Sequence, residues 1–391
     1  MSTPPSALDS LTSFEVVGLN SKFNFSDGHA YHAPPRALAG VYANLGGIWE
    51  AAATSSIPDA EDGFKNALAN LIDSPRLERH NFFSVLPTAS NSIDIVAAWL
   101  HMRGKRTGLL EPAFDNLPLM LKRRDLVLYP VNERDLLDLD SLEKKIDSQK
   151  LTALFVILPN NPTGFMLNAL DFRSLCELCE RKGVTFIVDK TFRLYSRDIF
   201  DDYAIMQDSG VEFVVIEDTG KTWPTLDLKV SLLVYKDTVA SELRMLYEEI
   251  FLCSSNFVLL LLTRLAQQTA HHGLAQVVQK PAAARLGLVG DVLANSPLSL
   301  VPNKFKTVLP LAWIDCKESG MTDLELVAYL KGYGLAVLPG RNFYWNSPEE
   351  NTYNIRISLM RPTMMFYTGL KALEKAVSNL SFPFYPLQKI A

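Results

Sequence analysis

The sequence has few cysteines and histidines and no excess of positive charge. Its 391 residues include four Cys and six His, and Cys176 and Cys179 have no second pair of ligands to complete a zinc site. Lys and Arg number 38 against 43 Asp and Glu, so the net charge of −5 argues against a nucleic-acid partner. No apolar run reaches the roughly 20 residues that a membrane helix needs. We therefore expect a cytoplasmic protein without a metal ion.

The pattern of apolar runs predicts an α/β fold. From about residue 46 to 280, short β-rich runs alternate with helical segments, which is typical of a mostly parallel sheet with helices on both faces. Residues 281–391 change to an α+β pattern and are expected to form a smaller domain. Residues 1–45 are polar and rich in turns, with little to bury, so we expect an arm or a lid joined to the small domain.

The segment 212–234 is expected to be a strand, a loop and a second strand, with Lys221 on the loop. A lysine there is either a surface residue or an amine used in covalent chemistry. The letters TGKT at 219–222 resemble the end of a phosphate-binding P-loop. That pattern needs a glycine where this chain has Val215, so a nucleotide site is not expected.

Three polar residues follow three predicted strands. Asn161, Asp189 and Lys221 each stand just past a strand end, and ligands of parallel sheets collect at that edge. Pyridoxal 5'-phosphate (PLP) needs a lysine for its imine, a carboxylate for its ring nitrogen and a donor for its phenolic oxygen. Lys221, Asp189 and Asn161 supply these groups, so the sequence predicts PLP as the cofactor.

Further residues could complete a PLP site. Phe114 could stack on the cofactor ring or pack in the core, and Arg356, alone in an apolar strand, could bind a substrate carboxylate. The hydroxyl-rich start of a helix near residue 90 is an anion site or simply a capped helix. The residues expected to share the phosphate are Ser90, Asn91, Thr219 and Lys229.

These residues occur in the order seen in fold type I PLP enzymes, which the chain resembles from about residue 80 to its end. The motifs are NNPTG (160–164), the strand-end aspartate, the lysine loop and the late arginine in NIRIS. A narrower similarity rests on DTGKTWPTLDLK (218–229), SDGHA (26–30), EPAFDN (111–116) and DKTFR (189–193). These motifs resemble the PLP-dependent L-arginine oxidases and hydroxylases and a sister branch that cyclises hydroxyarginine to enduracididine.

The resemblance implies a homodimer with PLP on Lys221 and an N-terminal arm that closes over bound arginine. It implies catalytic roles for Lys221, Asp189 and His29, with His29 handling water or an oxygen-derived species. Glu15 and Asp218 would hold the guanidinium. The substrate-binding set implied in this way is Thr12, Glu15, Asp27, Asp218 and Arg356. From local sequence alone, Asp27 would belong to a turn and His29 to the surface.

The expected activity is oxygen-dependent oxidation or 4-hydroxylation of free L-arginine, or of a hydroxyarginine, through a quinonoid intermediate in specialised biosynthesis. Two alternatives stay open, a cyclodehydratase that converts 4-hydroxyarginine to enduracididine and a plain class I/II aminotransferase. Phe192 stands where many aminotransferases have a tyrosine that contacts the phenolic oxygen. One hydrogen bond fewer at that oxygen suits an electron-rich state that meets dioxygen, but the sequence does not choose between the three outcomes.

Overall fold

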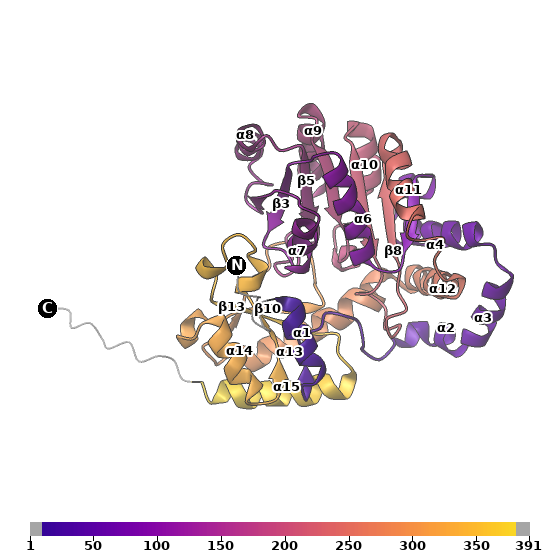
Figure 1. Ribbon diagram of the computed structural model, residues 1–391. Coiled ribbons are helices and arrows are strands. Elements are labelled where there is room, and N and C mark those ends of the chain that lie inside the picture. Colours follow the sequence, from indigo (N-terminus) through magenta and orange to yellow (C-terminus); the bar gives the residue numbers. More distant parts are fainter. Residues whose placement is uncertain (1–9, 381–391) are drawn as a thin grey trace. The chain divides into compact units, whose positions relative to one another are not determined.

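The computed structural model describes residues 10–380 and divides into two compact units (Figure 1). The large unit comprises residues 29–281 and 303–309. The small unit comprises the described part of 1–28 together with 282–302 and the described part of 310–391. The domain boundaries expected at 45 and 280 stay predictions.

The large unit is built on a seven-stranded sheet, as the alternating pattern predicted. The strand order is β2-β8-β7-β6-β5-β3-β4, in which β8 pairs antiparallel with β2 and β7 and all other pairs are parallel. The strands are β2 (Phe83–Leu86), β3 (Thr107–Glu111), β4 (Leu128–Asn132), β5 (Ala153–Ile157), β6 (Thr185–Asp189), β7 (Phe213–Asp218) and β8 (Ser231–Tyr235).

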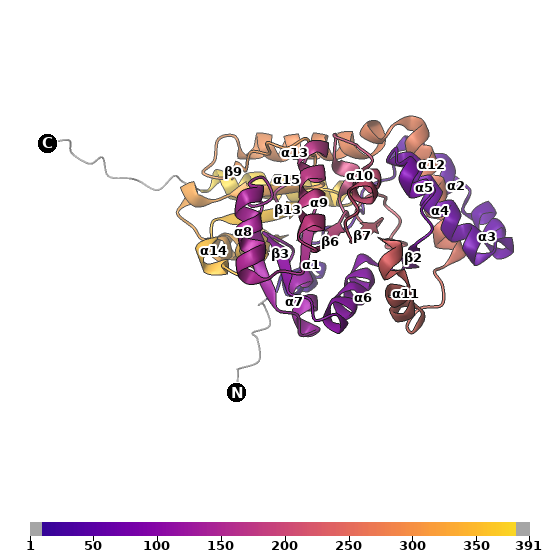
Figure 2. The same cartoon turned by 90° about the horizontal axis from the view of Figure 1, so that it is seen from above.

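Helices cover both faces of this sheet, which explains why β5 is apolar throughout and why β5 and β6 are both buried along their whole length. Figure 2 shows α9 and α10 on one side of the strands and α6 and α7 on the other. The helices of the large unit are α2 (Ala39–Ala43), α3 (Leu45–Thr54), α4 (Ile57–Leu71), α5 (Pro75–Glu78), α6 (Ala89–Met102), α7 (Asn116–Arg123), α8 (Leu139–Gln149), α9 (Ala169–Arg181), α10 (Asp202–Ser209), α11 (Ala240–Glu248) and α12 (Asn256–His272).

The helical region after β8 consists of two separate helices, α11 and α12. Helix α11 ends at Glu248 and α12 begins at Asn256. Between them the hydroxyl of Ser254 donates to the carbonyl of Val85 at 3.0 Å.

The small unit has a four-stranded antiparallel sheet of order β12-β13-β10-β9 and a two-stranded parallel sheet of β1 and β11. Its strands are β1 (Phe23–Asn24), β9 (Ser299–Leu300), β10 (Leu311–Asp315), β11 (Leu335–Ala336), β12 (Leu338–Pro339) and β13 (Asn354–Ser358). Its helices are α1 (Leu11–Leu19), α13 (Lys280–Leu293), which starts at the boundary, α14 (Asp323–Lys331) and α15 (Thr363–Ser378).

The N-terminal segment buries more than its composition suggested. Phe23 and Phe25 are buried, and the ring of Phe25 lies edge-on to Phe366 with centroids 6.1 Å apart. A side-chain carbon on Gly369 would come within 2.7 Å of Phe25, so a glycine is needed where α15 meets this ring. Residues 11–27 are therefore an integral part of the small unit. No helix within residues 10–380 is long and apolar enough to cross a membrane.

Candidate active site

Strands β5, β6 and β7 lie side by side and run in the same direction, so their carboxyl ends share one edge of the sheet. Asp189 pairs with Ile157 on one side and with Ile216 on the other. Asn161 follows β5, Asp189 ends β6, and Lys221 follows β7. The structure thus brings the three central residues of the predicted site to one edge of the large unit.

Asp189 is buried, with 8% of its surface exposed, and its Oδ1 accepts hydrogen bonds from Thr191 N at 2.8 Å and Thr191 Oγ1 at 2.6 Å. Burial raises the pKa of Asp189 to about 6; the bonds from Thr191 oppose this rise, and the charges of Asp218 and Glu217 add to it. No cation within residues 10–380 forms an ion pair with Asp189. A buried carboxylate of this kind fits the positively charged ring nitrogen of PLP.

Asn161 is a second residue whose surroundings suit a bound cofactor. It is 8% exposed, and its Oδ1 has no hydrogen-bond partner among the described residues. Buried polar atoms normally have partners, so an orphan amide oxygen at a strand edge suits a ligand. The Nδ2 group of the same amide is the donor that could reach a phenolic oxygen. Phe114 is half-buried and follows β3, the neighbour of β5, so its ring comes from the adjoining part of the same edge.

The lysine loop, which comprises residues 219–230 between β7 and β8, is closed at its base by Thr219 and Val230. Thr219 N and Oγ1 donate to Val230 O at 3.2 and 3.0 Å, and Val230 N donates to Thr219 Oγ1 at 2.9 Å. The hydroxyl of Tyr195, which the sequence analysis missed, donates to Lys221 O at 2.8 Å. These bonds fix the backbone that carries the half-buried Lys221. Thr219, predicted to bind phosphate, uses its hydroxyl within the loop.

Asp218 is the half-buried acid beside this lysine. Its Oδ2 accepts from Gly220 N at 3.0 Å. Burial raises the pKa of Asp218, while Lys221 and, to a lesser extent, Lys229 and His29 oppose the rise. The loop therefore presents a carboxylate and an amine next to each other.

The start of α6 lies against the end of the lysine loop, because Ser92 Oγ is 2.7 Å from Ser231 Oγ. The helix cap is Thr88, which the sequence analysis did not select; its Oγ1 accepts from Asn91 N at 3.2 Å and donates to Asn91 Oδ1 at 2.8 Å. Ser90 is exposed in the first turn. A helix start close to a loop that carries Lys229 is an arrangement suited to a phosphate.

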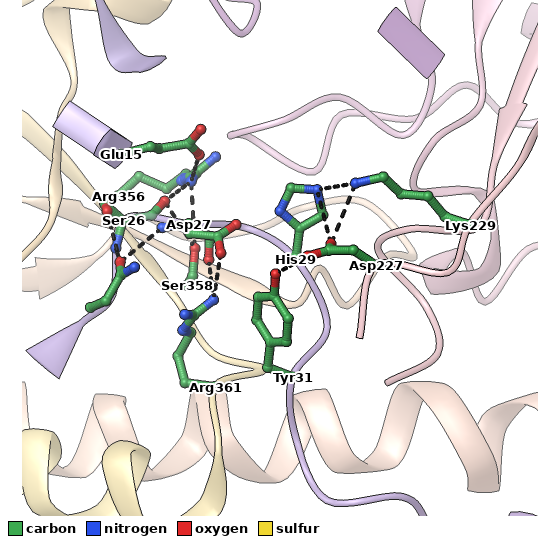
Figure 3. A network of polar contacts seen from close by, with 11 residues as sticks. Glu15, Ser26, Asp27, His29, Tyr31, Asp227, Lys229, Arg356, Ser358 and Arg361 are labelled. Carbon is green, nitrogen blue, oxygen red and sulfur yellow. Dashed lines mark hydrogen bonds and ion pairs between the residues drawn. The ribbon is translucent and has the colours of Figure 1, made fainter. Parts of the chain in front are cut away.

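His29 is attached to the lysine loop, as Figure 3 shows. Lys229 Nζ lies 2.9 Å from His29 Nε2 and 3.4 Å from Asp227 Oδ1. Tyr31 donates its hydroxyl to Asp227 Oδ2, and His29 Nε2 is 3.9 Å from Asp227 Oδ1. Sequence spacing gave no sign of this cluster, since about 200 residues separate its two segments.

Arg356 lies in β13 of the small unit and is 2% exposed. Its Nη2 is 3.6 Å from Oε1 of Glu15 in α1, and it also donates to the carbonyl of Ser26 (Figure 3). Arg356, which was expected to bind a substrate carboxylate, is thus paired within the small unit with Glu15, another predicted substrate residue.

Asp27 has a partner of the same kind. Its Oδ2 accepts from Nη1 of Arg361 at 3.1 Å, and both side chains are buried (Figure 3). Arg361 was not predicted, because a single arginine in a turn before a helix carries no special pattern. Thr12 is exposed on α1. The acids at 15 and 27 are each engaged with an arginine of their own unit.

A sequence profile of the aminotransferase class I and II family matches residues 50–368. The chain belongs to this family. Its members' cofactor, seen in a PLP-bound aminotransferase from Clostridium difficile 630 of similar fold (TM-score 0.72, 17% identity, 90% and 91% coverage), is pyridoxal 5'-phosphate. The cofactor prediction and the fold type I prediction are confirmed.

Solved structures support the same fold. MppP, in a structure soaked with its product 2-ketoarginine, is 28% identical with a TM-score of 0.82, covering 90% of this chain and 98% of its own. YbdL from Escherichia coli, a methionine aminotransferase, is 16% identical with a TM-score of 0.75, covering 96% and 100%. Aspartate aminotransferase from Thermus thermophilus is 15% identical with a TM-score of 0.73, covering 95% and 97%. No curated relative matches the sequence.

Proposed function

We propose that Lys221 carries PLP and that the edge of the large sheet positions it. When bound, the cofactor withdraws electrons from the α-carbon of an amino acid and makes its proton acidic. Asp189 holds the proton of the ring nitrogen, Asn161 donates to the phenolic oxygen, and Phe114 stacks on the ring. Ser90, Asn91, Thr219 and Lys229 form the phosphate site, Thr219 by fixing the loop. The amine of Lys221 would then take the α-proton.

The substrate that we propose is free L-arginine or a hydroxyarginine. The observation that carries this proposal is Asp218, a half-buried carboxylate three residues before the cofactor lysine. A guanidinium is planar and binds carboxylates through two parallel hydrogen bonds, which makes Asp218 a suitable receptor. The 28% identity to MppP, whose product is 2-ketoarginine, supports the same substrate class.

The proposed reaction is an oxidation by dioxygen, with or without 4-hydroxylation. Conversion of the amine to a 2-oxo acid consumes one water, removes two electrons and releases ammonia, and one dioxygen accepts the electrons and leaves as hydrogen peroxide. Where C4 is hydroxylated as well, two further electrons pass to a second dioxygen, and a second water supplies the hydroxyl oxygen. His29 is proposed to handle the water or oxygen-derived species. Thr12, Glu15, Asp27 and Arg356 are proposed to bind substrate, and the enzyme is proposed to be a homodimer.

One experiment separates this reaction from its rivals. Purified enzyme is given arginine and then 4-hydroxyarginine, each with and without oxygen and with and without a 2-oxo acid, and the products are read by mass spectrometry. Oxygen-dependent oxidation of arginine supports the proposal. Turnover only with an added 2-oxo acid identifies an aminotransferase, and oxygen-free cyclisation of hydroxyarginine identifies a cyclodehydratase.

The cofactor lysine is tested separately. Borohydride reduction of the PLP-loaded enzyme, followed by peptide mapping, should place the label on Lys221. A label on another lysine overturns the assignment whatever the reaction.

A further inference from the structure

Glu133 lies at the same edge of the large sheet and has no role in the proposal above. It is the first residue after β4, which pairs in parallel with β3, and β3 pairs in parallel with β5. The carboxyl ends of these three strands therefore lie next to one another. Glu133 follows one of them, Pro112 follows the second, and the loop with Asn160 and Asn161 follows the third.

One oxygen of Glu133 connects the three strand ends. Its Oε1 accepts from Thr163 Oγ1 at 2.5 Å and from Asn160 Nδ2 at 2.7 Å. The same Nδ2 donates to Pro112 O at 2.9 Å. Pro112 precedes Phe114 by two residues, so this carboxylate holds both the loop of the predicted phenolic-oxygen donor and the turn of the predicted stacking ring.

The loop after β5 is closed on itself around these contacts. Asn160 N donates to Phe165 O and Gly164 N to Asn160 O, both at 2.8 Å, and Phe165 N donates to Thr163 Oγ1 at 3.2 Å. Asn161 sits between the two residues that Glu133 holds. Its own Oδ1 has no hydrogen-bond partner within residues 10–380, so the backbone of the loop decides where the amide points.

The charge of Glu133 is unusual for its place. Within residues 10–380 no cation forms an ion pair with it, and its two side-chain bonds come from neutral donors. Burial raises its pKa, and the bonds from Thr163 and then Asn160 oppose that rise. A carboxylate that is partly buried without a cation is costly, so the contacts it makes need an explanation beyond general stability.

We propose that Glu133 is a positioning residue that holds the amide of Asn161 at the phenolic oxygen of the cofactor. The inference rests on the role proposed for Asn161. Both hydrogen bonds go to Oε1 of Glu133. Positioning of Asn161 therefore requires one acceptor oxygen at this place and does not require the negative charge of the carboxylate.

The test is the pKa at which the visible absorbance of the PLP-loaded enzyme changes. A hydrogen bond donated to the phenolic oxygen lowers this pKa, so Asn161→Ala should raise it by about one unit, the size expected for one such bond. Glu133→Leu and Thr163→Val should raise it in the same direction, whereas Glu133→Gln, which keeps the acceptor oxygen, should leave it near wild type. Glu133→Leu combined with Asn161→Ala should shift it no further than Asn161→Ala alone.

A second readout needs no cofactor. In the apoenzyme, amide hydrogen exchange over residues 160–165 should become at least several-fold faster in Glu133→Leu and Thr163→Val and stay unchanged in Glu133→Gln. Glu143→Leu, in α8, removes an acid that contacts Arg181 and Lys182 and should alter neither readout. If Asn161→Ala shifts the absorbance pKa but neither Glu133→Leu nor Thr163→Val does, the positioning role of Glu133 is overturned and the role proposed for Asn161 stands. An unshifted Asn161→Ala overturns the role proposed for Asn161 and the inference with it.

Discussion

Asp189 and Asp218 end two neighbouring parallel strands, β6 and β7, and the charge of Asp218 adds to the effect of burial in raising the pKa of Asp189. Asp189 pairs with Ile216, two residues before Asp218. Two carboxylates on neighbouring strand ends repel each other in a buried place, so each is stabilised by a cation of its own. Lys221 is the largest opposing charge at Asp218, and Asp189 is left for a cation that a ligand brings.

The first prediction concerns Asp189→Asn in the apoenzyme. In the wild-type protein the pKa of Asp189 is raised from 3.8 to about 6. Between these two pH values the folded state holds a proton that the unfolded state has lost, so the stability of the wild-type protein falls as pH rises. Asparagine keeps the acceptor for Thr191 and removes this dependence. The variant should therefore gain stability over wild type between about pH 4 and pH 6, by about 3 kcal/mol in total, and hold that gain above.

The measurement is urea unfolding of both apoenzymes across this pH range. The same substitution should weaken PLP binding by about ten- to a hundredfold, since a charge-assisted contact is lost. A constant difference in stability across pH would show that Asp189 does not titrate as described.

The second prediction tests the guanidinium receptor. Asp218→Asn should raise the KM for arginine by about ten- to a hundredfold, because one charge-assisted contact disappears. Norleucine, whose side chain is neutral and has no guanidinium, serves as the control substrate and should be affected much less. Equal losses for the two substrates would count against Asp218 as the receptor.

The sequence predicted the central sheet and the common edge of Asn161, Asp189 and Lys221 because these features depend on local patterns. Long apolar runs mark buried parallel strands, and polar residues just after them must lie at the carboxyl edge. The cap at Thr88 was missed by two residues, since Thr88, Ser90 and Ser92 are all good capping types and only backbone geometry decides among them.

Contacts between distant segments could not be predicted in this way. Tyr31 and Asp227 bond across about 200 residues, and nothing in either local sequence indicates the other. The burial of Phe23 and Phe25 depends on β11 and α15, more than 300 residues later. Polar and turn-forming neighbours made that segment look like a surface arm.

The third prediction uses Gly220. An added side-chain carbon would lie 2.7 Å from Cδ of Lys229 and 3.2 Å from Oδ2 of Asp218, so Gly220→Ala should displace the flexible Lys229 chain. We expect a folded enzyme whose affinity falls by about tenfold for PLP and much less for pyridoxal, which has no phosphate. Gly40→Ala, which meets no atom within 4 Å, is the matched control. Equal losses for both ligands would separate Lys229 from phosphate binding.

A buried network of charges lies directly behind the site edge. Lys190 Nζ is 2.8 Å from Asp202 Oδ2, and Arg193 Nη1 is 2.9 Å from Asp202 Oδ1. Arg193 also contacts both oxygens of Glu217, at 3.0 and 2.7 Å, and the hydroxyl of Tyr203 donates to Glu217 at 2.8 Å. Lys190 and Glu217 are the direct chain neighbours of Asp189 and Asp218, so this network fixes the backbone that carries both acids.

The fourth prediction follows from Asp202, which is 1% exposed and serves two cations. Asp202→Asn leaves Lys190 and one side of Arg193 without their anion and should destabilise the protein by about 3–5 kcal/mol. Burial opposes ionisation of Asp202, but the charges of Arg193 and Lys190 lower its pKa to about 2. The loss of stability in Asp202→Asn should therefore be complete above the ordinary pKa of 3.8 and should become smaller as the pH falls towards 2. Asp208→Asn, which breaks the exposed pair with Arg76, should cost less than about 1 kcal/mol. The free energy of unfolding of both variants is measured in urea. Similar losses in the two would mean that the buried network stabilises the protein no more than the exposed pair does.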